Sequence, residues 1–243
     1  MALSRAGQND SGAMALFLDV DGTLIDFAAS PEAAFAPAEL PAILQSASRR
    51  LNGALALVSG RSIAELDRLM APLQLPSIGL HGAELRLTPA GPATTPAKLP
   101  VELVEALRGQ LAPYDGAKLE DKGASIAIHY RAAPHLAAEL HALLLRYIGR
   151  MEAPPLELMV GELVYELKPP GFDKGTAISA FMQCAPFSGR KPVFIADHPI
   201  DQAGFATATS LGGYGLSVGR LLPGAACWFS DTEAVRAWLK DLA

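Results

Sequence analysis

The sequence contains little cysteine and no cluster of histidines. Its 243 residues include two cysteines, Cys184 and Cys227, and five histidines. The two cysteines lie in different segments, and no CxxC pair is present. This pattern argues against a disulfide framework and against a zinc site, and it predicts a reducing compartment, the cytoplasm, as the location.

Long apolar runs are absent as well. No stretch approaches the roughly 20 residues that a membrane-spanning helix needs. Residues 1–13 are mostly small and polar, so we expect a loose N-terminal tail. The apolar run of residues 13–18 that follows Arg5 is too short for a signal peptide, and Asp19 interrupts it. We therefore expect no membrane partner.

Basic residues are in deficit. The chain has 20 Lys and Arg against 25 Asp and Glu, which gives a formal net charge of −5 at pH 7. This balance argues against a nucleic-acid-binding surface. A small phosphate-bearing partner is compatible with it, because local groups and a bound cation decide such affinity. We expect a small-molecule partner and a monomer.

Short apolar runs alternate with helical patterns along most of the chain. Half of the residues are hydrophobic, enough for a sizeable core. Continuous apolar runs of this length are typical of strands buried on both faces, and their alternation with helices predicts an α/β fold with a doubly wound parallel sheet. We expect strands at 14–18, 54–58, 77–80, 192–196, 214–218 and 226–229, and helices at 37–51, 62–70, 174–183 and 232–239.

A smaller domain is predicted inside this fold. Residues 88–100 are rich in Pro, Thr, Gly and Ala, as in a linker, and residues 169–171 have the same character. We therefore expect a core made of residues 14–87 and 169–243, with residues 88–168 inserted as an α/β domain. Its expected elements are helices near 101–112 and 134–149 and strands near 124–130, 156–159 and 162–167.

Two carboxylates end the first predicted strand. Asp19 and Asp21 follow the apolar run 14–18 and precede Gly22. Carboxylates at the end of a buried strand are costly unless a metal or a hydrogen-bonding turn compensates them. In open α/β sheets, ligands bind just beyond the carboxyl ends of the strands. The stretch therefore predicts a metal- or ligand-binding site, and the alternative is an acidic turn with no binding role.

Other strand ends add the groups that phosphoryl transfer needs. Ser59 follows the second strand, Asp197 and Asp201 follow the strand at 192–196, and Lys174 begins a helix. One carboxylate can attack phosphorus while another acid protonates the leaving oxygen and then activates water. A hydroxyl and an ammonium can hold phosphoryl oxygens, and Mg²⁺ can neutralise their charge. The set predicts a phosphatase that acts through an aspartyl phosphate.

Each of these residues also has a purely structural interpretation. Ser59 could be the N-cap of the helix at 62–70. Lys174 could be a solvated surface lysine, as most lysines are. Asp197 could be an ordinary loop residue. The set favours catalysis more strongly than any single member does.

The same residues resemble the four motifs of the haloacid dehalogenase superfamily of phosphatases. The motifs are Asp19–Thr23, Ser59–Arg61, Lys174–Gly175 and Asp197. From about Leu16 to Leu239, the chain is more closely similar to the trehalose-6-phosphate phosphatase family. The stretches that carry this closer resemblance are Leu57–Ser62, Gly79–Glu84, Leu119–Lys122, Ala127–Arg131 and Tyr165–Gly175.

The resemblance implies Mg²⁺-dependent hydrolysis of trehalose 6-phosphate. Asp19 would be the nucleophile and a metal ligand. Asp21 would be the general acid and base, with its backbone carbonyl on the metal. Asp197 would be the remaining ligand, supported by Asp201. The residues that would hold the phosphoryl group are Thr23, Ser59, Gly60 and Lys174.

The resemblance also implies roles in the inserted domain, which would be a cap that closes over the site. Glu120, Lys122 and Glu166 match the family's sugar-contacting residues, and Arg131 belongs to the same motif, together with His129. Lys168 competes with Lys174 for the phosphate. We favour Lys174 because a glycine and a helix start follow it, which would aim the ammonium and backbone N–H groups at an anion.

The last motif departs from the family pattern, which reads Gly-Asp-Asp-x-Thr-Asp-Glu. Here His198 replaces an acid, Ile200 replaces the threonine and Gln202 replaces the final acid. The groups that orient Mg²⁺ and its waters are therefore altered. Two alternatives to an active trehalose-6-phosphate phosphatase follow: a weakly active or inactive relative that binds a sugar phosphate, or a phosphatase for another sugar phosphate.

Overall fold

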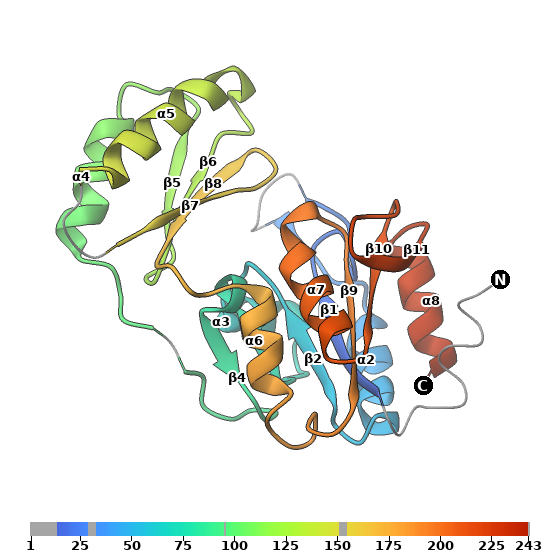
Figure 1. The fold of residues 1–243 in the computed structure, drawn as a ribbon. Coiled ribbons are helices and arrows are strands. Elements are labelled where there is room, and N and C mark those ends of the chain that lie inside the picture. Colours follow the sequence, from blue (N-terminus) through green and yellow to red (C-terminus); the bar gives the residue numbers. More distant parts are fainter. Residues whose placement is uncertain (1–13, 29–32, 95, 151–154, 243) are drawn as a thin grey trace. The chain divides into compact units, whose positions relative to one another are not determined.

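The computed structural model describes residues 14–28, 33–94, 96–150 and 155–242 (Figure 1). The predicted tail, residues 1–13, lies outside these ranges. The chain divides into two compact units, Met1–Thr94 with Asp173–Ala243, and Thr95–Phe172. Among the described residues, no helix combines the length and the apolar character that crossing a membrane requires.

A seven-stranded sheet forms the centre of the first unit, in the order β11-β10-β9-β1-β2-β3-β4 (Figure 1). Neighbouring strands are parallel except for β3 and β4, so the predicted α/β class is confirmed and β4 is an additional antiparallel edge. Every residue of β1 is buried, as its apolar run predicts. The strands are β1 (Met14–Asp19), β2 (Leu55–Val58), β3 (Ser77–Gly79), β4 (Glu84–Arg86), β9 (Lys191–Ala196), β10 (Tyr214–Val218) and β11 (Ala225–Phe229).

Two pairs of helices pack with one another in this unit. Helix α2 (Leu40–Arg50) contacts α8 (Thr232–Leu242), and α6 (Lys174–Phe181) contacts α7 (Gln202–Ser210). The sequence did not predict α7. Its residues are Gln-Ala-Gly-Phe-Ala-Thr-Ala-Thr-Ser, whose small side chains give little amphipathic contrast.

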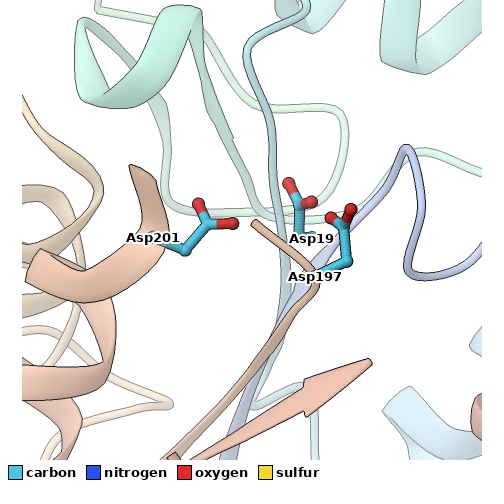
Figure 2. A group of neighbouring side chains, drawn as sticks. All are labelled: Asp19, Asp197 and Asp201. Atoms are coloured by element: carbon cyan, nitrogen blue, oxygen red, sulfur yellow. The ribbon is translucent and has the colours of Figure 1, made fainter. Parts of the chain in front are cut away.

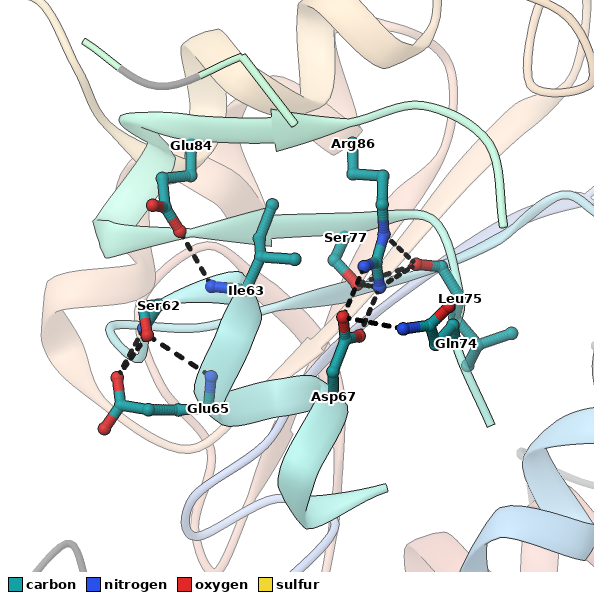
Figure 3. A network of polar contacts seen from close by, with 9 residues as sticks. All are labelled: Ser62, Ile63, Glu65, Asp67, Gln74, Leu75, Ser77, Glu84 and Arg86. Atoms are coloured by element: carbon teal, nitrogen blue, oxygen red, sulfur yellow. Dashed lines mark hydrogen bonds and ion pairs between the residues drawn. The ribbon is translucent and has the colours of Figure 1, made fainter. Parts of the chain in front are cut away.

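Polar contacts anchor helix α3 (Ile63–Leu69) to the edge of the sheet (Figure 3). Arg86 on β4 is buried and donates two hydrogen bonds, of 2.7 and 2.6 Å, to the carboxylate of Asp67. Glu84, also on β4, accepts a 2.7 Å hydrogen bond from the backbone N–H of Ile63. The first turn of α3 is therefore fixed to β4.

The second unit contains a four-stranded antiparallel sheet, in the order β5-β6-β8-β7. Its own apolar core includes Leu107, Leu140 and Leu144 from two helices. The sequence did not predict β5, because its residues Lys-Leu-Glu-Asp are mostly charged. The elements are α4 (Val101–Leu111), β5 (Lys118–Asp121), β6 (Ile126–His129), α5 (Ala137–Ile148), β7 (Glu157–Val160) and β8 (Val164–Lys168).

The unit Thr95–Phe172 begins and ends later than the insertion expected at residues 88–168. Thr94 exchanges two backbone hydrogen bonds with Leu85, of 3.0 and 2.8 Å, next to β4. The Pro- and Thr-rich stretch after residue 88 is therefore tied to the first unit by an antiparallel bridge. Composition alone did not reveal this bridge.

Candidate active site

Three carboxylates meet at the carboxyl ends of β1 and β9 (Figure 2). Asp19 is the last residue of β1, Asp197 directly follows β9, and Asp201 ends the short helical turn η5 (Pro199–Asp201). One oxygen from each carboxylate lies within 4.8 Å of the others. The acids meet because β1 and β9 are parallel neighbours that end at the same edge of the sheet.

Lys174 supplies positive charge to this cluster. Its Nζ lies 2.8 Å from Oδ1 of Asp19 and 2.5 Å from Oδ1 of Asp201. Burial lowers the pKa of Lys174, but these two carboxylates raise it by more, so the net pKa lies above the ordinary value. Lys174 is buried, and its interpretation as a solvated surface lysine is wrong.

The acids carry more negative charge than Lys174 balances. Burial, followed by the charges of Asp201 and Asp197, raises the pKa of Asp19 well above its usual value despite the opposing effect of Lys174. Burial and Asp201 likewise raise the pKa of Asp197. Three carboxylates against one ammonium suit a divalent cation, and carboxylate oxygens are the donors that Mg²⁺ prefers.

Gly22 is required where the backbone passes this cluster. It has a φ of +77°, and a Cβ there would lie 2.3 Å from Oδ2 of Asp197. Only glycine adopts this conformation and this approach without strain. The buried hydroxyl of Thr23 is 3.5 Å from Oδ1 of Asp197. The backbone of the turn after β1 therefore lies directly against the carboxylate of Asp197.

Asp21 does not belong to the group of three acids and has a partner of its own. Nε and Nη2 of Arg61 donate hydrogen bonds to Oδ2 and Oδ1 of Asp21, both of 2.7 Å. From the sequence alone, Arg61 had no predicted role beyond membership of the Ser59–Arg61 motif. The signal that could have revealed it is its place directly after a strand end that was already assigned to the site.

Ser59 and Gly60 form a tightly held loop after β2. Ser59 is buried, and its hydroxyl accepts a 3.1 Å hydrogen bond from the backbone N–H of Arg61. The N-cap of α3 is Ser62, so the interpretation of Ser59 as a helix cap is wrong. A Cβ on Gly60 would lie 2.4 Å from Nε2 of His81, so no larger residue fits without a shift.

A strained turn packs against this loop. Leu80 and His81 both have left-handed backbones, with φ values of 46° and 55°. Such a residue costs on the order of 1–3 kcal/mol and persists only where its surroundings hold it. Leu80 N–H donates to the carbonyl of Arg61 (2.9 Å), and His81 N–H donates to that of Ser59 (3.0 Å). The turn therefore fixes the loop that carries Ser59 and Arg61.

In the second unit, the predicted sugar-contacting residues lie near one another on one sheet face. Glu120 and Glu166 flank Ala127 across adjacent strands. Glu166 is buried and accepts hydrogen bonds from Lys122 (3.2 Å) and from the hydroxyl of Ser125 (2.6 Å).

His129 and Arg131, from the same predicted motif, have different surroundings. Glu120 lies 2.7 Å from Nε2 of His129, and this hydrogen bond is the largest contribution to the lowered pKa of Glu120. Arg131 is exposed. His129 therefore lies on the same polar face of the sheet as Glu120. Arg131 lies just beyond the end of β6.

A model of the trehalose-phosphatase family matches residues 17–219 of the chain. The chain belongs to this family. It is 40% identical over 237 residues to a Sinorhizobium fredii protein named "Probable trehalose-phosphate phosphatase", with 94% of this chain and 87% of the relative covered. It is 39% identical over 234 residues to the trehalose-6-phosphate phosphatase of Escherichia coli, with 95% and 86% covered.

The solved C-terminal domain of the C. albicans trehalose-6-phosphate phosphatase has the same fold. Its TM-score with this chain is 0.79, at 19% identity, with 95% of this chain and 92% of that domain covered. At this level of identity the likeness shows the fold alone. It agrees with the α/β sheet described above.

The substituted motif of this trehalose-phosphatase family member has a structural role. Nδ1 of His198 accepts a 3.2 Å hydrogen bond from Ile200 N–H, and His198 N–H donates to Oδ2 of Asp201 at 3.3 Å. The imidazole thus caps the η5 turn as an aspartate side chain would. Gln202 is exposed at the first position of α7.

The two candidate lysines of the family motif have separate surroundings. Lys168, at the end of β8, contacts the carboxylate of Glu157 and the carbonyl of Phe172 within the second unit. Lys174 contacts Asp19, as described above. This difference supports the choice of Lys174 as the cation that serves the phosphoryl group.

Proposed function

We propose that this chain hydrolyses trehalose 6-phosphate to trehalose and phosphate through an aspartyl phosphate on Asp19. The observation that carries the proposal is the buried contact of Asp19 with Lys174, beside Asp197 and Asp201, at the strand ends. Membership of the trehalose-phosphatase family supports the substrate. The residues proposed to hold the phosphoryl group are Thr23, Ser59, Gly60 and Lys174.

The reaction has two steps. An Asp19 oxygen attacks phosphorus, the bond from phosphorus to the sugar oxygen breaks, and Asp21 gives its proton to that oxygen. Water then attacks the phosphorus of the aspartyl phosphate and gives a proton to Asp21, and the bond from phosphorus to Asp19 breaks. General acid–base catalysis of this kind contributes roughly 10²–10⁴-fold. Free Asp19 and protonated Asp21 are restored.

One Mg²⁺ is the proposed cofactor. The carboxylates of Asp19 and Asp197 and the backbone carbonyl of Asp21 would hold it, and Asp201 would support them. Burial, together with the charges of the neighbouring acids, raises the pKa values of Asp19 and Asp197, and a bound cation would offset that crowded negative charge, which supports this assignment. When bound, Mg²⁺ offsets the negative charge on the phosphoryl oxygens.

Phosphate release from a panel of sugar phosphates, with Mg²⁺ and with a chelator, tests this function. We expect the highest kcat/KM with trehalose 6-phosphate, loss of turnover on chelation and recovery when Mg²⁺ is restored. A higher kcat/KM with another sugar phosphate would reassign the substrate. Binding of sugar phosphates without any phosphate release would favour the alternative of an inactive binding protein.

The second unit is proposed to recognise the sugar. A disaccharide offers many hydroxyls, and loss of one charged hydrogen bond costs about 1.5–3 kcal/mol. Alanine at Glu120 or Lys122, and glutamine at Glu166, should therefore lower kcat/KM for trehalose 6-phosphate by roughly 10- to 100-fold. A small aryl phosphate should be affected much less. Steady-state kinetics with both substrates measure this difference.

Glu139→Ala is a suitable control for these variants, because Glu139 is an exposed acid on α5 of the same unit. It should leave both substrates unaffected. Equal losses on the disaccharide phosphate and on the aryl phosphate would remove these residues from sugar recognition.

The substituted motif is proposed to weaken Mg²⁺ binding. The double variant His198→Asp, Gln202→Glu restores two acids near Asp197. A carboxylate at position 198 can still accept the hydrogen bond from Ile200, so the η5 turn should persist. We expect the Mg²⁺ concentration for half-maximal activity to fall by about tenfold, with faster turnover. Metal titrations of activity measure this change.

Gln183→Glu is the control for these added charges, because it places an acid on the exposed surface after α6. It should leave the Mg²⁺ titration unchanged. If the double variant also titrated like the wild type, His198 and Gln202 would be neutral replacements for the metal site.

A further inference from the structure

A two-point hydrogen bond fixes the carboxylate of Asp21. Nε and Nη2 of Arg61 each donate to a different oxygen of Asp21, at 2.7 Å. The side chains are 13% and 25% exposed for Arg61 and Asp21, so both are partly shielded from solvent. The planar fork of a guanidinium sets the position and the plane of a carboxylate together, which an ammonium does not.

The backbone that carries Arg61 is held by short contacts on several sides. Its N–H donates to Oγ of Ser59 at 3.1 Å, and its carbonyl accepts from Leu80 at 2.9 Å. Ser59 in turn donates its N–H to the carbonyl of Ile78 at 2.8 Å. The guanidinium therefore extends from a loop that is bonded to β3 and to the strained turn after it.

Helix α3 anchors the other end of this loop (Figure 3). Ser62 and Glu65 form a reciprocal capping box, and Glu84 accepts from the N–H of Ile63 at 2.7 Å. Arg61 directly precedes this cap. Its backbone is thus fixed before and after the residue, so its side chain starts from a rigid support.

The strained turn at residues 79–82 also lies against the backbone that carries Lys174. A Cβ on Gly82 would lie 2.4 Å from the carbonyl of Asp173, the N-cap of α6. The two aspartates at the end of β1 each pair with one cation, Asp19 with Lys174 and Asp21 with Arg61. The turn at residues 79–82 packs against the backbone that presents both cations.

We propose that Arg61 is a positioning residue for the phosphatase reaction. It holds Asp21 in the orientation from which this carboxyl group exchanges protons with the sugar oxygen and then with water. Arg61 acts through Asp21: its guanidinium fork engages both oxygens of the ionised carboxylate, and when one oxygen carries the proton, an N–H of the fork still donates to the other oxygen. The inference rests on the proposed function, in which Asp21 is the acid and base.

Kinetics of Arg61 variants test this role. For trehalose 6-phosphate, Arg61→Ala should lower kcat by about 100-fold with little change in KM, because proton transfer is impaired and substrate binding is not. Arg61→Lys keeps the charge without the fork and should lose about 10-fold. Guanidinium at millimolar concentration should partly restore Arg61→Ala, and it should not stimulate the wild type or Asp21→Asn.

An aryl phosphate separates positioning from a general structural defect. Its phenolate leaves without a proton, whereas hydrolysis of the aspartyl phosphate still needs Asp21 as a base. Arg61→Ala should therefore release a burst of about one phenolate per enzyme and then turn over slowly. Arg68→Ala, on the exposed side of α3, is the matched control and should behave like the wild type.

The outcomes separate the inference from the proposed function. Wild-type kcat in Arg61→Ala, or equal loss of the burst and the slow phase without rescue by guanidinium, overturns the positioning role while the function stands. If Arg61→Ala does not fold, Arg61→Lys decides: a wild-type kcat overturns the inference, and a lower kcat with a retained burst supports it. A wild type inactive on every phosphate ester overturns both.

Discussion

Replacing Asp19 by asparagine should abolish turnover of trehalose 6-phosphate, with a loss greater than about 10⁴-fold. An amide has nearly the shape of the carboxylate but is not a competent nucleophile, so no aspartyl phosphate can form. The fold should persist, because Lys174 keeps its contact with Asp201 and the variant removes one of three crowded acids. Phosphate release and thermal unfolding measure the two effects.

Asp26→Asn provides a matched control for this variant. Asp26 follows the same strand, is exposed, and accepts a 2.7 Å hydrogen bond from the hydroxyl of Thr232, which an asparagine oxygen can also accept. It should keep wild-type activity. If Asp19→Asn, prepared free of deamidated protein, kept wild-type activity as well, the aspartyl-phosphate mechanism would be wrong.

Replacing Lys174 by methionine should cost both activity and stability. The lysine is the cation buried between Asp19 and Asp201, so its removal leaves two acids without their partner. Breaking a buried ion pair in this way costs about 3–5 kcal/mol in the free energy of unfolding. Turnover should fall by more than about 10³-fold, because the phosphoryl group loses its ammonium. Denaturant unfolding and steady-state kinetics measure these losses.

Mg²⁺ binding distinguishes the role of Lys174 from that of the acids. Lys174→Met keeps all the proposed metal ligands, so calorimetric titration should show Mg²⁺ binding at least as tight as in the wild type. Lys240→Met, an exposed lysine on α8, is the control and should change neither stability nor activity. A Lys174→Met variant with normal turnover would exclude this lysine from phosphate binding.

Local sequence patterns predicted much of the fold. The apolar run of β1 predicted a buried strand, and the full burial of Met14–Asp19 agrees with it. By contrast, β5 and α7 were missed because a charged strand and a helix of small residues have weak periodicity. The antiparallel edge strand β4 was missed because its three residues, Glu-Leu-Arg, are too few to show a strand pattern.

The residues of the candidate site were likewise predicted only in part. The residues at the strand ends and at one helix start predicted Asp19, Asp197 and Lys174 as site residues. The structure brings these three side chains together. Their catalytic roles stay predictions. Arg61 was not given a role, since the motif that contains it does not say which carboxylate it meets. The cap formed by His198 was also missed, because it depends on the hydrogen-bonded geometry of one turn.

By itself, the sequence determined the α/β class, the family and the acids at the ends of β1 and β9, because burial, periodicity and motifs are properties of neighbouring residues. Only the tertiary structure decided the partners: Lys174 with Asp19 and Asp201, and Arg61 with Asp21. These pairs join segments far apart in the chain. The register of parallel strands and the close packing of loops bring their atoms within hydrogen-bonding distance, and neither is encoded in a local pattern.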